Sequence, residues 1–369
     1  MTASDTNILQ FGKTAHVRRV PSHRYTDSNY LELERQRVFQ RAWLAVCRVD
    51  DIAQPGSYRT FEQFGESVLV VRNERGGVSA FHNTCRHRGS KLLDGCGRVR
   101  EIQCPYHGWT YGLDGGLQSV PRADGFEHLH QSRMSLFPVR VDTWAGFVWI
   151  NLDEEAPGLH DALSGVDNEL AAYRLEEMEP IQRKVIPLPV NWKTMLENVT
   201  DFYHVPVVHG RTVSWAVDEA PDMKSLGDHT RQRLDIAAYG WRRRLDRMCT
   251  RGGPYTDKQL TALHKYLLFP NFLINVLPYH LTVMQVFPVE AQSCELHYGF
   301  YRRRGARGLE RLRGYGTWLA SRYILLEDLK IIERFQAGVS TGRLATQQLH
   351  LEEAAISHFH GVLSRWVGQ

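Results

Sequence analysis

Two stretches of this sequence decide its fold, Cys85-Arg86-His87-Arg88-Gly89 and Cys104-Pro105-Tyr106-His107-Gly108-Trp109. Each stretch holds one cysteine and one histidine close together, a combination typical of metal binding. Zinc sites more often leave two to four residues between paired ligands, so that both side chains turn onto one ion. Only Arg86 separates Cys85 from His87, which instead indicates two loops that present ligands to a larger group. A two-iron, two-sulfide cluster is such a group, with two thiolates on one iron and two imidazoles on the other.

Glycines and the remaining cysteines fit this interpretation. Glycine lets backbone amides approach the cluster sulfurs at points where a side chain would block them. The glycines that we expect to do so are Gly89, Gly95, Gly97 and Gly108. The other four cysteines have no ligand-like histidine nearby and are expected to be small buried hydrophobic residues. They are Cys47, Cys96, Cys249 and Cys294.

A second polar group lies within residues 191–209 and contains His204 and His209. Positions five apart on an unbroken helix lie roughly 500° apart around the axis and do not share a face. Pro206 lies between the histidines and is expected to end a helix near His204, so that the chain turns and brings His209 back. Two histidines and one carboxylate form the facial triad of non-haem iron(II) oxygenases. The segment therefore predicts two of the three ligands of a mononuclear iron.

The third ligand must come from elsewhere, and Glu327, Asp328 and Glu333 are the candidates. Asp328 shares the apolar stripe of a predicted helix with Ile324 and Ile331. An unpaired carboxylate is costly on such a face, and a metal offsets that cost. Glu327 shares its face with charged residues and is expected to be solvated. Asp328 is therefore predicted as the third ligand.

The 369 residues suit two domains of unequal size. Short β-rich runs alternate with glycine turns up to about residue 152, which predicts a small antiparallel β domain. Longer helical patterns follow, and they predict an α+β domain whose antiparallel sheet is covered by helices. The small domain is predicted at 40–152 and the larger one at 1–39 and 153–369. The helices expected in the larger domain are 29–43, 159–173, 192–204, 309–335 and 351–366, and the expected strands are 281–286 and 294–301.

Together, these motifs resemble the catalytic alpha subunits of Rieske non-haem iron ring-hydroxylating oxygenases. The similarity includes the late Glu327-Asp328 segment. It implies a Rieske β domain inserted in a helix-grip catalytic domain. The cysteines would hold the cluster iron remote from the catalytic site, and the histidines would hold the outer one. The implied groups are a [2Fe-2S] Rieske cluster on Cys85, His87, Cys104 and His107, and a mononuclear Fe(II) on His204, His209 and Asp328.

The same resemblance implies partners. In this family, electrons from NAD(P)H drive the activation of O2. The sequence contains no dinucleotide fingerprint and no flavin site, so we expect a separate flavin reductase to deliver the electrons, either directly or through a ferredoxin. The chain length is similar to that of family members that act as homotrimers without a small subunit.

Asp201 lies three residues before His204, so the two would share a face of a helix. The simplest role for it is to orient His204 through the free ring nitrogen. The resemblance implies a sharper role, in which this acid connects His107 of one subunit to His204 of the next for electron transfer. This route requires an oligomer, most simply a head-to-tail ring of three. Asp201 is therefore predicted to be a catalytic residue.

The resemblance leaves the substrate open. One alternative is hydroxylation or dihydroxylation of a small aromatic molecule. The other is monooxygenation that causes N- or O-dealkylation or hydroxylates a quaternary amine. Carnitine-type members tend to carry Glu at the position of Asp201, which favours the aromatic alternative. A Rieske electron carrier is a third alternative, opposed by the predicted iron ligands. The candidate pocket residues are Phe202, Val205, Val208, Trp215, Phe272 and Asn275.

Composition argues against other classes of protein. The apolar stretch at 266–279 is broken by prolines and asparagines and is too short to span a membrane. The first ten residues do not resemble a secretory signal, so a cytoplasmic location is expected. The chain has 45 Lys+Arg against 41 Asp+Glu. Its basic clusters at 242–251 and 302–313 are more typical of a solvated surface or subunit contact than of nucleic-acid binding.

Overall fold

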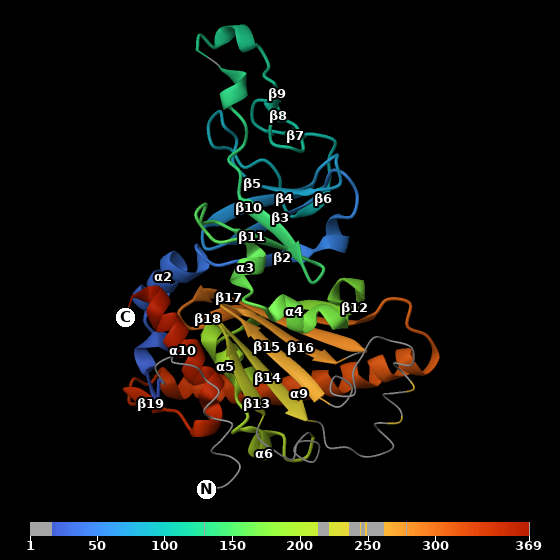
Figure 1. The fold of residues 1–369 in the computed structure, drawn as a ribbon. Coiled ribbons are helices and arrows are strands. Elements are labelled where there is room, and N and C mark those ends of the chain that lie inside the picture. Colours follow the sequence, from blue (N-terminus) through green and yellow to red (C-terminus); the bar gives the residue numbers. More distant parts are fainter. Residues whose placement is uncertain are drawn as a thin grey trace. The chain divides into compact units, whose positions relative to one another are not determined.

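A computed structural model of the chain describes residues 17–128, 130–212, 221–235, 262–277 and 279–368, together with Arg244 and Met248. The chain divides into two compact units. Phe39–Leu159 form the smaller unit, and Met1–Val38 and His160–Gln369 together form the larger one. The smaller unit therefore interrupts the larger one in the sequence, as the colours of Figure 1 show.

The smaller unit consists of three small antiparallel sheets (Figure 1). Their strand orders are β5-β4-β3-β6, β10-β11-β2 and β7-β8-β9. Tight turns join neighbouring strands, as between β4 and β5, where the side chain of Asn73 accepts hydrogen bonds from the amides of Arg75 and Gly77. The predicted small antiparallel β domain is confirmed. Its strands are β2 (Leu44–Arg48), β3 (Ser57–Gln63), β4 (Glu66–Arg72), β5 (Val78–His82), β6 (Cys96–Arg98), β7 (Ile102–Gln103), β8 (Thr110–Tyr111), β9 (Leu117–Ser119), β10 (Arg140–Trp144) and β11 (Phe147–Asn151).

The larger unit contains a seven-stranded antiparallel sheet in the order β12-β18-β17-β16-β15-β14-β13. Helix α5 (Trp192–Thr200) contacts β15, β17 and β18, and α10 (Ala354–Val367) contacts β13 and β14. The long helix α9 (Gly308–Val339) packs against α5 and β18. A separate pair joins β1 (Arg19–Pro21) to β19 (Thr346–Gln348). The α+β prediction, with helices covering an antiparallel sheet, is confirmed. The strands of the large sheet are β12 (Met178–Leu188), β13 (Asp222–Leu226), β14 (His229–Asp235), β15 (Ala262–Leu268), β16 (Phe272–Leu277), β17 (His280–Glu290) and β18 (Ser293–Arg303).

The single helix expected over 159–173 is wrong. Two short helices occupy this segment, α3 (Leu159–Ala162) and α4 (Val166–Leu170). Ser164 and Gly165 between them have φ angles of 51° and 89°. A residue in the left-handed region cannot continue a right-handed helix, so the segment divides at this point.

The helix expected over 29–43 is shorter in the structure: α2 (Ser28–Glu34) passes into a π-helical turn at its C-terminal end.

A buried ion pair anchors the start of α5. Oε1 of Glu34 lies 2.7 Å from Nζ of Lys193, and both side chains are fully buried. Nε1 of Trp192 donates to the other oxygen of Glu34 at 2.8 Å. Buried charges need such partners, so the pair holds α2 and α5 together.

Candidate functional site

The three predicted iron ligands lie together in the larger unit. His204 and His209 flank the one-turn helix α6 (Val205–Val208), and Asp328 lies on α9. Oδ1 of Asp328 lies 2.9 Å from Nε2 of His209 and 3.6 Å from Nε2 of His204. One ligand atom from each residue lies within 4.8 Å of the others. With metal–ligand bonds of about 2.1 Å, neighbouring ligands of one ion lie about 3 Å apart, so these residues fit a facial triad.

The histidines meet because α5 ends earlier than expected. The helix stops at Thr200, and Asp201 has an extended backbone with φ −76° and ψ 138°. The side chain of Asp201 accepts a hydrogen bond at 2.6 Å from the amide two residues later, which makes a tight turn. Pro206 lies in the first turn of α6, where its missing N–H removes no helical hydrogen bond. The prediction that Pro206 ends the preceding helix is therefore wrong, although the chain does turn between His204 and His209.

Two carboxylates contact the outer nitrogens of these histidines. Oδ2 of Asp201 lies 3.0 Å from Nδ1 of His204, and Oε2 of Glu327 lies 2.8 Å from Nδ1 of His209. Thr212 Oγ1 donates to the same oxygen of Glu327 at 2.8 Å. Carboxylates in this position fix the tautomer and orientation of a metal-binding imidazole. The expectation that Glu327 is merely solvated is wrong, because its side of α9 packs against His209.

The charges of the triad favour a cation. Burial lowers the pKa of His204, but hydrogen bonds to Asp201 and Asp328 outweigh this effect and raise the pKa to about 9. Burial raises the pKa of Asp328, but hydrogen bonds to His204 and His209 outweigh it and lower the pKa to about 2. Positive charge is therefore stabilised between the carboxylate and the imidazoles. A divalent metal ion supplies such charge.

The two cysteine–histidine stretches form matching loops in the smaller unit. The amide of Gly89 donates to the carbonyl of Cys85 at 2.9 Å, and the amide of Gly108 donates to the carbonyl of Cys104 at 3.0 Å. These glycines have φ angles of 75° and 71°, which residues with a Cβ rarely adopt. Both cysteine side chains are buried. Each loop thus presents one buried thiol and one imidazole in the same way.

The side chains of these loops fit an iron–sulfur cluster. The ring centroids of His87 and His107 lie 4.6 Å apart, and His87 stacks on Trp109 with a centroid distance of 5.0 Å. Nδ1 of His87 is buried and has no hydrogen-bond partner among the described residues. A buried polar atom without a partner is costly, and binding to a cluster iron offsets that cost.

One expectation for the neighbouring segment is corrected. Cys96 is exposed rather than buried, whereas Cys47 and Cys294 are buried as expected. Gly97 lies opposite Tyr58 in the β3–β6 pair. An added Cβ at Gly97 would lie 3.0 Å from the Tyr58 hydroxyl, so this glycine packs closely against Tyr58. Cys249 lies outside the described residues.

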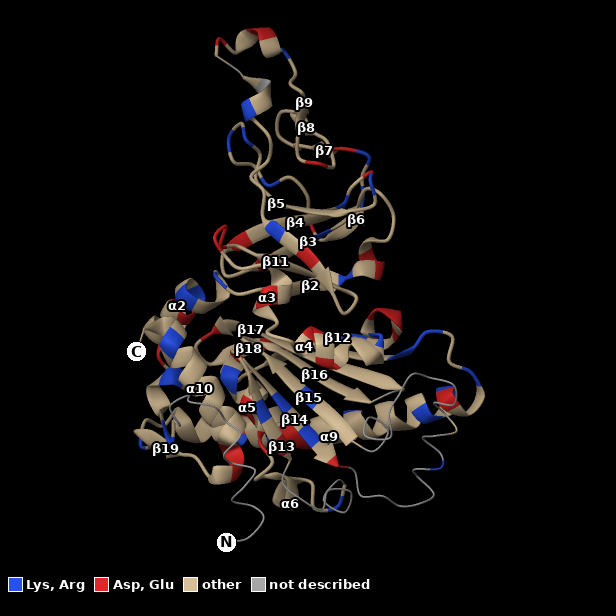
Figure 2. Cartoon of the chain, viewed as in Figure 1, with Lys and Arg blue, Asp and Glu red and all other residues tan. Residues whose placement is uncertain are grey.

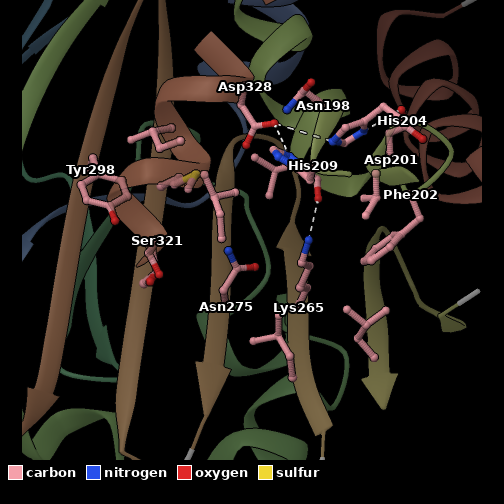
Figure 3. A pocket seen from close by; sticks show the side chains of 18 of the residues that line it. Asn198, Asp201, Phe202, His204, His209, Lys265, Asn275, Tyr298, Ser321 and Asp328 are labelled. Atoms are coloured by element: carbon pink, nitrogen blue, oxygen red, sulfur yellow. Dashed lines mark hydrogen bonds and ion pairs between the residues drawn. The ribbon is translucent and has the colours of Figure 1, made fainter. Parts of the chain in front are cut away.

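A pocket of about 160 Å³ adjoins the triad. Figure 3 shows His204, His209 and Asp328 at one end, with Lys265 and Asn275 extending toward them from neighbouring strands of the sheet. The α5–α6 segment and α9 also contribute lining residues. A partly enclosed space beside a metal triad is the arrangement that an oxygenase substrate requires.

Three of the residues suggested as pocket residues line this pocket, namely Phe202, Val205 and Asn275. Val208 and Phe272 are not among its lining residues, and Trp215 lies outside the described part of the chain. Sequence reasoning missed the polar residues contributed by the sheet, because it predicted neither strand β15 nor the residues of β17 and β18 that face the pocket. These residues are Lys265, His280, Thr282 and Tyr298.

Two protein families match the chain. The family described as "Rieske [2Fe-2S] domain" matches residues 42–137, and the family described as "Ring hydroxylating alpha subunit (catalytic domain)" matches residues 175–369. The chain therefore belongs to the ring-hydroxylating alpha-subunit family of Rieske non-haem iron oxygenases. It is an oxidoreductase that uses a Rieske [2Fe-2S] cluster and a mononuclear iron, as its motifs predicted. A Rieske carrier without a catalytic domain is excluded.

The names of individual relatives specify a substrate, which the two family descriptions do not. The chain is 30% identical over 356 residues to the carnitine monooxygenase oxygenase subunit of Acinetobacter baumannii, covering 93% of each chain. It is 28% identical to the chloroplastic choline monooxygenase of Spinacia oleracea, over 92% of this chain and 76% of that protein. The crystal structure of a quaternary ammonium Rieske monooxygenase in complex with L-carnitine has a TM-score of 0.78 at 28% identity, covering 94% of each chain. The assignment of each ligand residue in this chain stays a prediction that the distances above support.

The surface features expected from composition are partly visible. None of the helices in the described ranges is long and apolar enough to cross a membrane. Arg302 and Arg303 form ion pairs with Glu179 and Glu310, so these basic residues have acidic neighbours in the same unit. Figure 2 shows basic and acidic segments on many elements of the chain. Most of the 242–251 cluster lies outside the described residues.

Proposed function

We propose that this protein is the oxygenase subunit of a Rieske monooxygenase that oxidises a carbon–hydrogen bond next to the nitrogen of a small quaternary amine. The observation that carries the proposal is the similarity to a carnitine monooxygenase over 93% of both chains. Asp201 had favoured an aromatic substrate, but Asp and Glu differ by one methylene. Asp201 already reaches Nδ1 of His204 at 3.0 Å, so this position is weak evidence for either substrate class.

The pocket supports a small and polar substrate. Its volume of about 160 Å³ lies below the roughly 300–1,000 Å³ of pockets for drug-sized ligands. A cavity of roughly 150 Å³ holds a molecule the size of benzene, so the space suits a small substrate. A hydrocarbon would also leave buried polar groups without partners. The polar lining groups from the sheet include Lys265, Asn275, Thr282 and Tyr298.

The proposed reaction consumes one O2 and two electrons. One oxygen atom enters the carbon–hydrogen bond and gives a carbinol next to nitrogen, and the other leaves as water. NAD(P)H supplies the two electrons, and its hydrogen and one further proton form that water. The carbinol then loses its hydroxyl proton and its carbon–nitrogen bond breaks, which yields a tertiary amine and an aldehyde. His204, His209 and Asp328 would hold the iron that supplies O2 activation.

We further propose that a separate flavin reductase delivers the electrons and that the protein acts as a homotrimer. A structure of a quaternary ammonium Rieske monooxygenase with 26% identity is described as giving insights into inter-subunit electron transfer. In this chain, His107 is exposed in the smaller unit, and Asp201 contacts His204 in the larger one. The route would run from His107 of one subunit through Asp201 to His204 of the next.

The test is product analysis of the holoenzyme with a Rieske reductase, NADH and O2. Quaternary amines such as carnitine, glycine betaine and choline are compared with benzene and benzoate. A tertiary amine and an aldehyde should appear in equal amounts, one of each per NADH consumed. His204→Ala, as the control, should form neither. Hydroxylated aromatic products without any amine cleavage would overturn the proposed substrate class.

A further inference from the structure

Lys265 is a charged residue in the wall of the pocket. It lies in the middle of β15 and extends toward the triad (Figure 3). No other Lys, Arg, Asp or Glu occurs in β15 or β16, and Figure 2 shows basic segments on β15 and on its neighbour β14. A charged residue in such an apolar part of a sheet needs a physical explanation.

Lys265 belongs to a row of polar side chains across the sheet, in which it also pairs with Gln232 on β14. It pairs with Asn275 on β16, and Asn275 pairs with Thr282 on β17. Paired residues of neighbouring strands point to the same face, and all three line the pocket. Tyr298 on β18 is 4% exposed and also lines it. The hydroxyl of Tyr298 and Oδ1 of Asn275 are buried without a hydrogen-bond partner in the described ranges.

The protein satisfies the Lys265 ammonium only in part. Nζ donates to the carbonyl of Val199 at 3.1 Å and lies 4.5 Å from the ring centroid of Phe202. Among the described residues, no carboxylate forms an ion pair with the Lys265 ammonium. An ammonium group has three donors, so two remain after the bond to Val199. The Lys265 side chain is partly exposed, and it lines the pocket.

A quaternary amine alone would be a poor ligand for this pocket. Its permanent positive charge and that of Lys265 would repel each other in a site from which water is largely excluded. A carboxylate on the same molecule adds an attraction to Lys265 that opposes this repulsion. It would accept short, charge-assisted hydrogen bonds from Lys265 and lie near the side-chain amide of Asn275.

We propose that Lys265 binds a carboxylate of the substrate, so that the pocket selects zwitterionic amines over amines that have a neutral tail. The inference rests on the proposed function and narrows its substrate class. Lys265 is then a specificity-determining residue that contacts the substrate, and Asn275 lies beside the same group.

The test uses matched ligands on the anaerobic holoenzyme, with dissociation constants from isothermal titration calorimetry. Glycine betaine and choline differ by a carboxylate in place of a hydroxymethyl group. Benzoate and benzyl alcohol form the same contrast without nitrogen. The variants are Lys265→Met, which removes the charge at similar size, and Lys265→Arg, which keeps it. Lys224→Met is the control, since Lys224 pairs with Glu169 and does not line the pocket.

Wild-type protein should bind the carboxylate of at least one pair more tightly than the alcohol. Lys265→Met should weaken carboxylate binding by roughly 30-fold or more, as when one partner of a buried charge pair is removed. Choline binding should be unchanged or stronger, because the repulsion is gone. Lys265→Arg should retain part of the preference, and Lys224→Met should retain all of it.

The pH dependence provides a second readout. Burial lowers the pKa of Lys265 to about 8, although Asp328 and Asp201 act to raise it. The ammonium is charged below this pH and loses its charge as the pH rises, so carboxylate affinity should fall through about pH 8. A cation at the triad would shift this fall to lower pH. The difference between wild type and Lys265→Met isolates the lysine from the other titratable groups that line the pocket, which are Asp201, His204, His209, His280, Tyr298 and Asp328.

The outcomes separate this inference from the proposed function. A preference for benzoate that is lost in Lys265→Met, with no binding of either amine, would support the role of Lys265 and overturn the amine substrate. Equal weakening of carboxylate and alcohol would mean that Lys265 only supports the end of α5 through Val199, and it would overturn the inference. The absence of any carboxylate preference in wild type would overturn it as well.

Discussion

Removing the carboxylate behind His209 tests whether residues outside the triad determine its affinity for iron. Glu327→Ala removes the 2.8 Å contact with Nδ1 of His209 and the 2.8 Å hydrogen bond from Thr212. The imidazole then loses the group that fixes its orientation and raises its basicity. We therefore expect Nε2 of His209 to hold a metal less tightly, even though every predicted ligand is still present.

The structure sets the expected size of this effect. Loss of an outer carboxylate typically costs about 10- to 100-fold in metal affinity. The side chain of Glu327 is 24% exposed, so water can replace part of the lost contact. We expect the lower part of the range, about 10- to 30-fold, which equals about 1.4–2 kcal/mol. Glu327→Gln keeps an oxygen acceptor and should cost less.

The measurement is an anaerobic Fe(II) titration of protein that lacks the mononuclear iron but retains its cluster. Bound iron is counted per chain by a colorimetric assay, and the visible spectrum reports on the cluster. Glu333→Ala is the matched control, because Glu333 lies exposed on the same helix. Wild-type affinity in Glu327→Ala, or an equal loss in Glu333→Ala, would refute the reasoning.

Cys104→Ser should abolish the red-brown colour and the acid-labile sulfide, because the cluster would lose a thiolate; unchanged sulfide would argue for a different ligand. Asp201→Asn should keep both metals and the cluster spectrum but lose nearly all turnover. Stopped-flow absorbance should then show slow reoxidation of the reduced cluster by O2 with substrate present, and rapid reoxidation would contradict the inter-subunit route. Lys193→Met should lower the free energy of unfolding by about 3–5 kcal/mol, since Glu34 remains buried without its partner. Denaturant unfolding measures this loss, and the double variant with Glu34→Gln should recover part of it if the pair interacts as described.

The sequence alone determined the class of this protein, because the groups that define the class are close together along the chain. Cys85 and His87 lie on one loop, and Cys104 and His107 lie on another. Their spacing therefore indicated a cluster before any fold was known. Asp328 could be selected over Glu327 because helical periodicity predicts which residues of a helix face inward, and Asp328 is indeed 7% exposed.

Most strands of the large sheet could not be predicted in the same way. Strand β16 is buried at five of its six positions and was not predicted, and only 281–286 of β17 were predicted, although nine consecutive residues of that strand are buried. A strand that is covered on both faces shows no alternation of polar and apolar residues, so it lacks the signal that identifies strands. In the sequence, Lys265 is recognisable only as a charged residue beside an apolar run, and its role depends on the strand around it.

Only the tertiary structure decided which polar groups meet at the site. Whether α5 ends at Thr200 or continues to His204 depends on the turn at Asp201, which the proline signal did not reveal. Glu327 and His209 are 118 positions apart in the sequence, yet their side chains lie 2.8 Å apart. Lys265 and Asn275 share a face only through the register of β15 and β16. Such contacts form when separate helices and strands pack together, and no local pattern of residues specifies them.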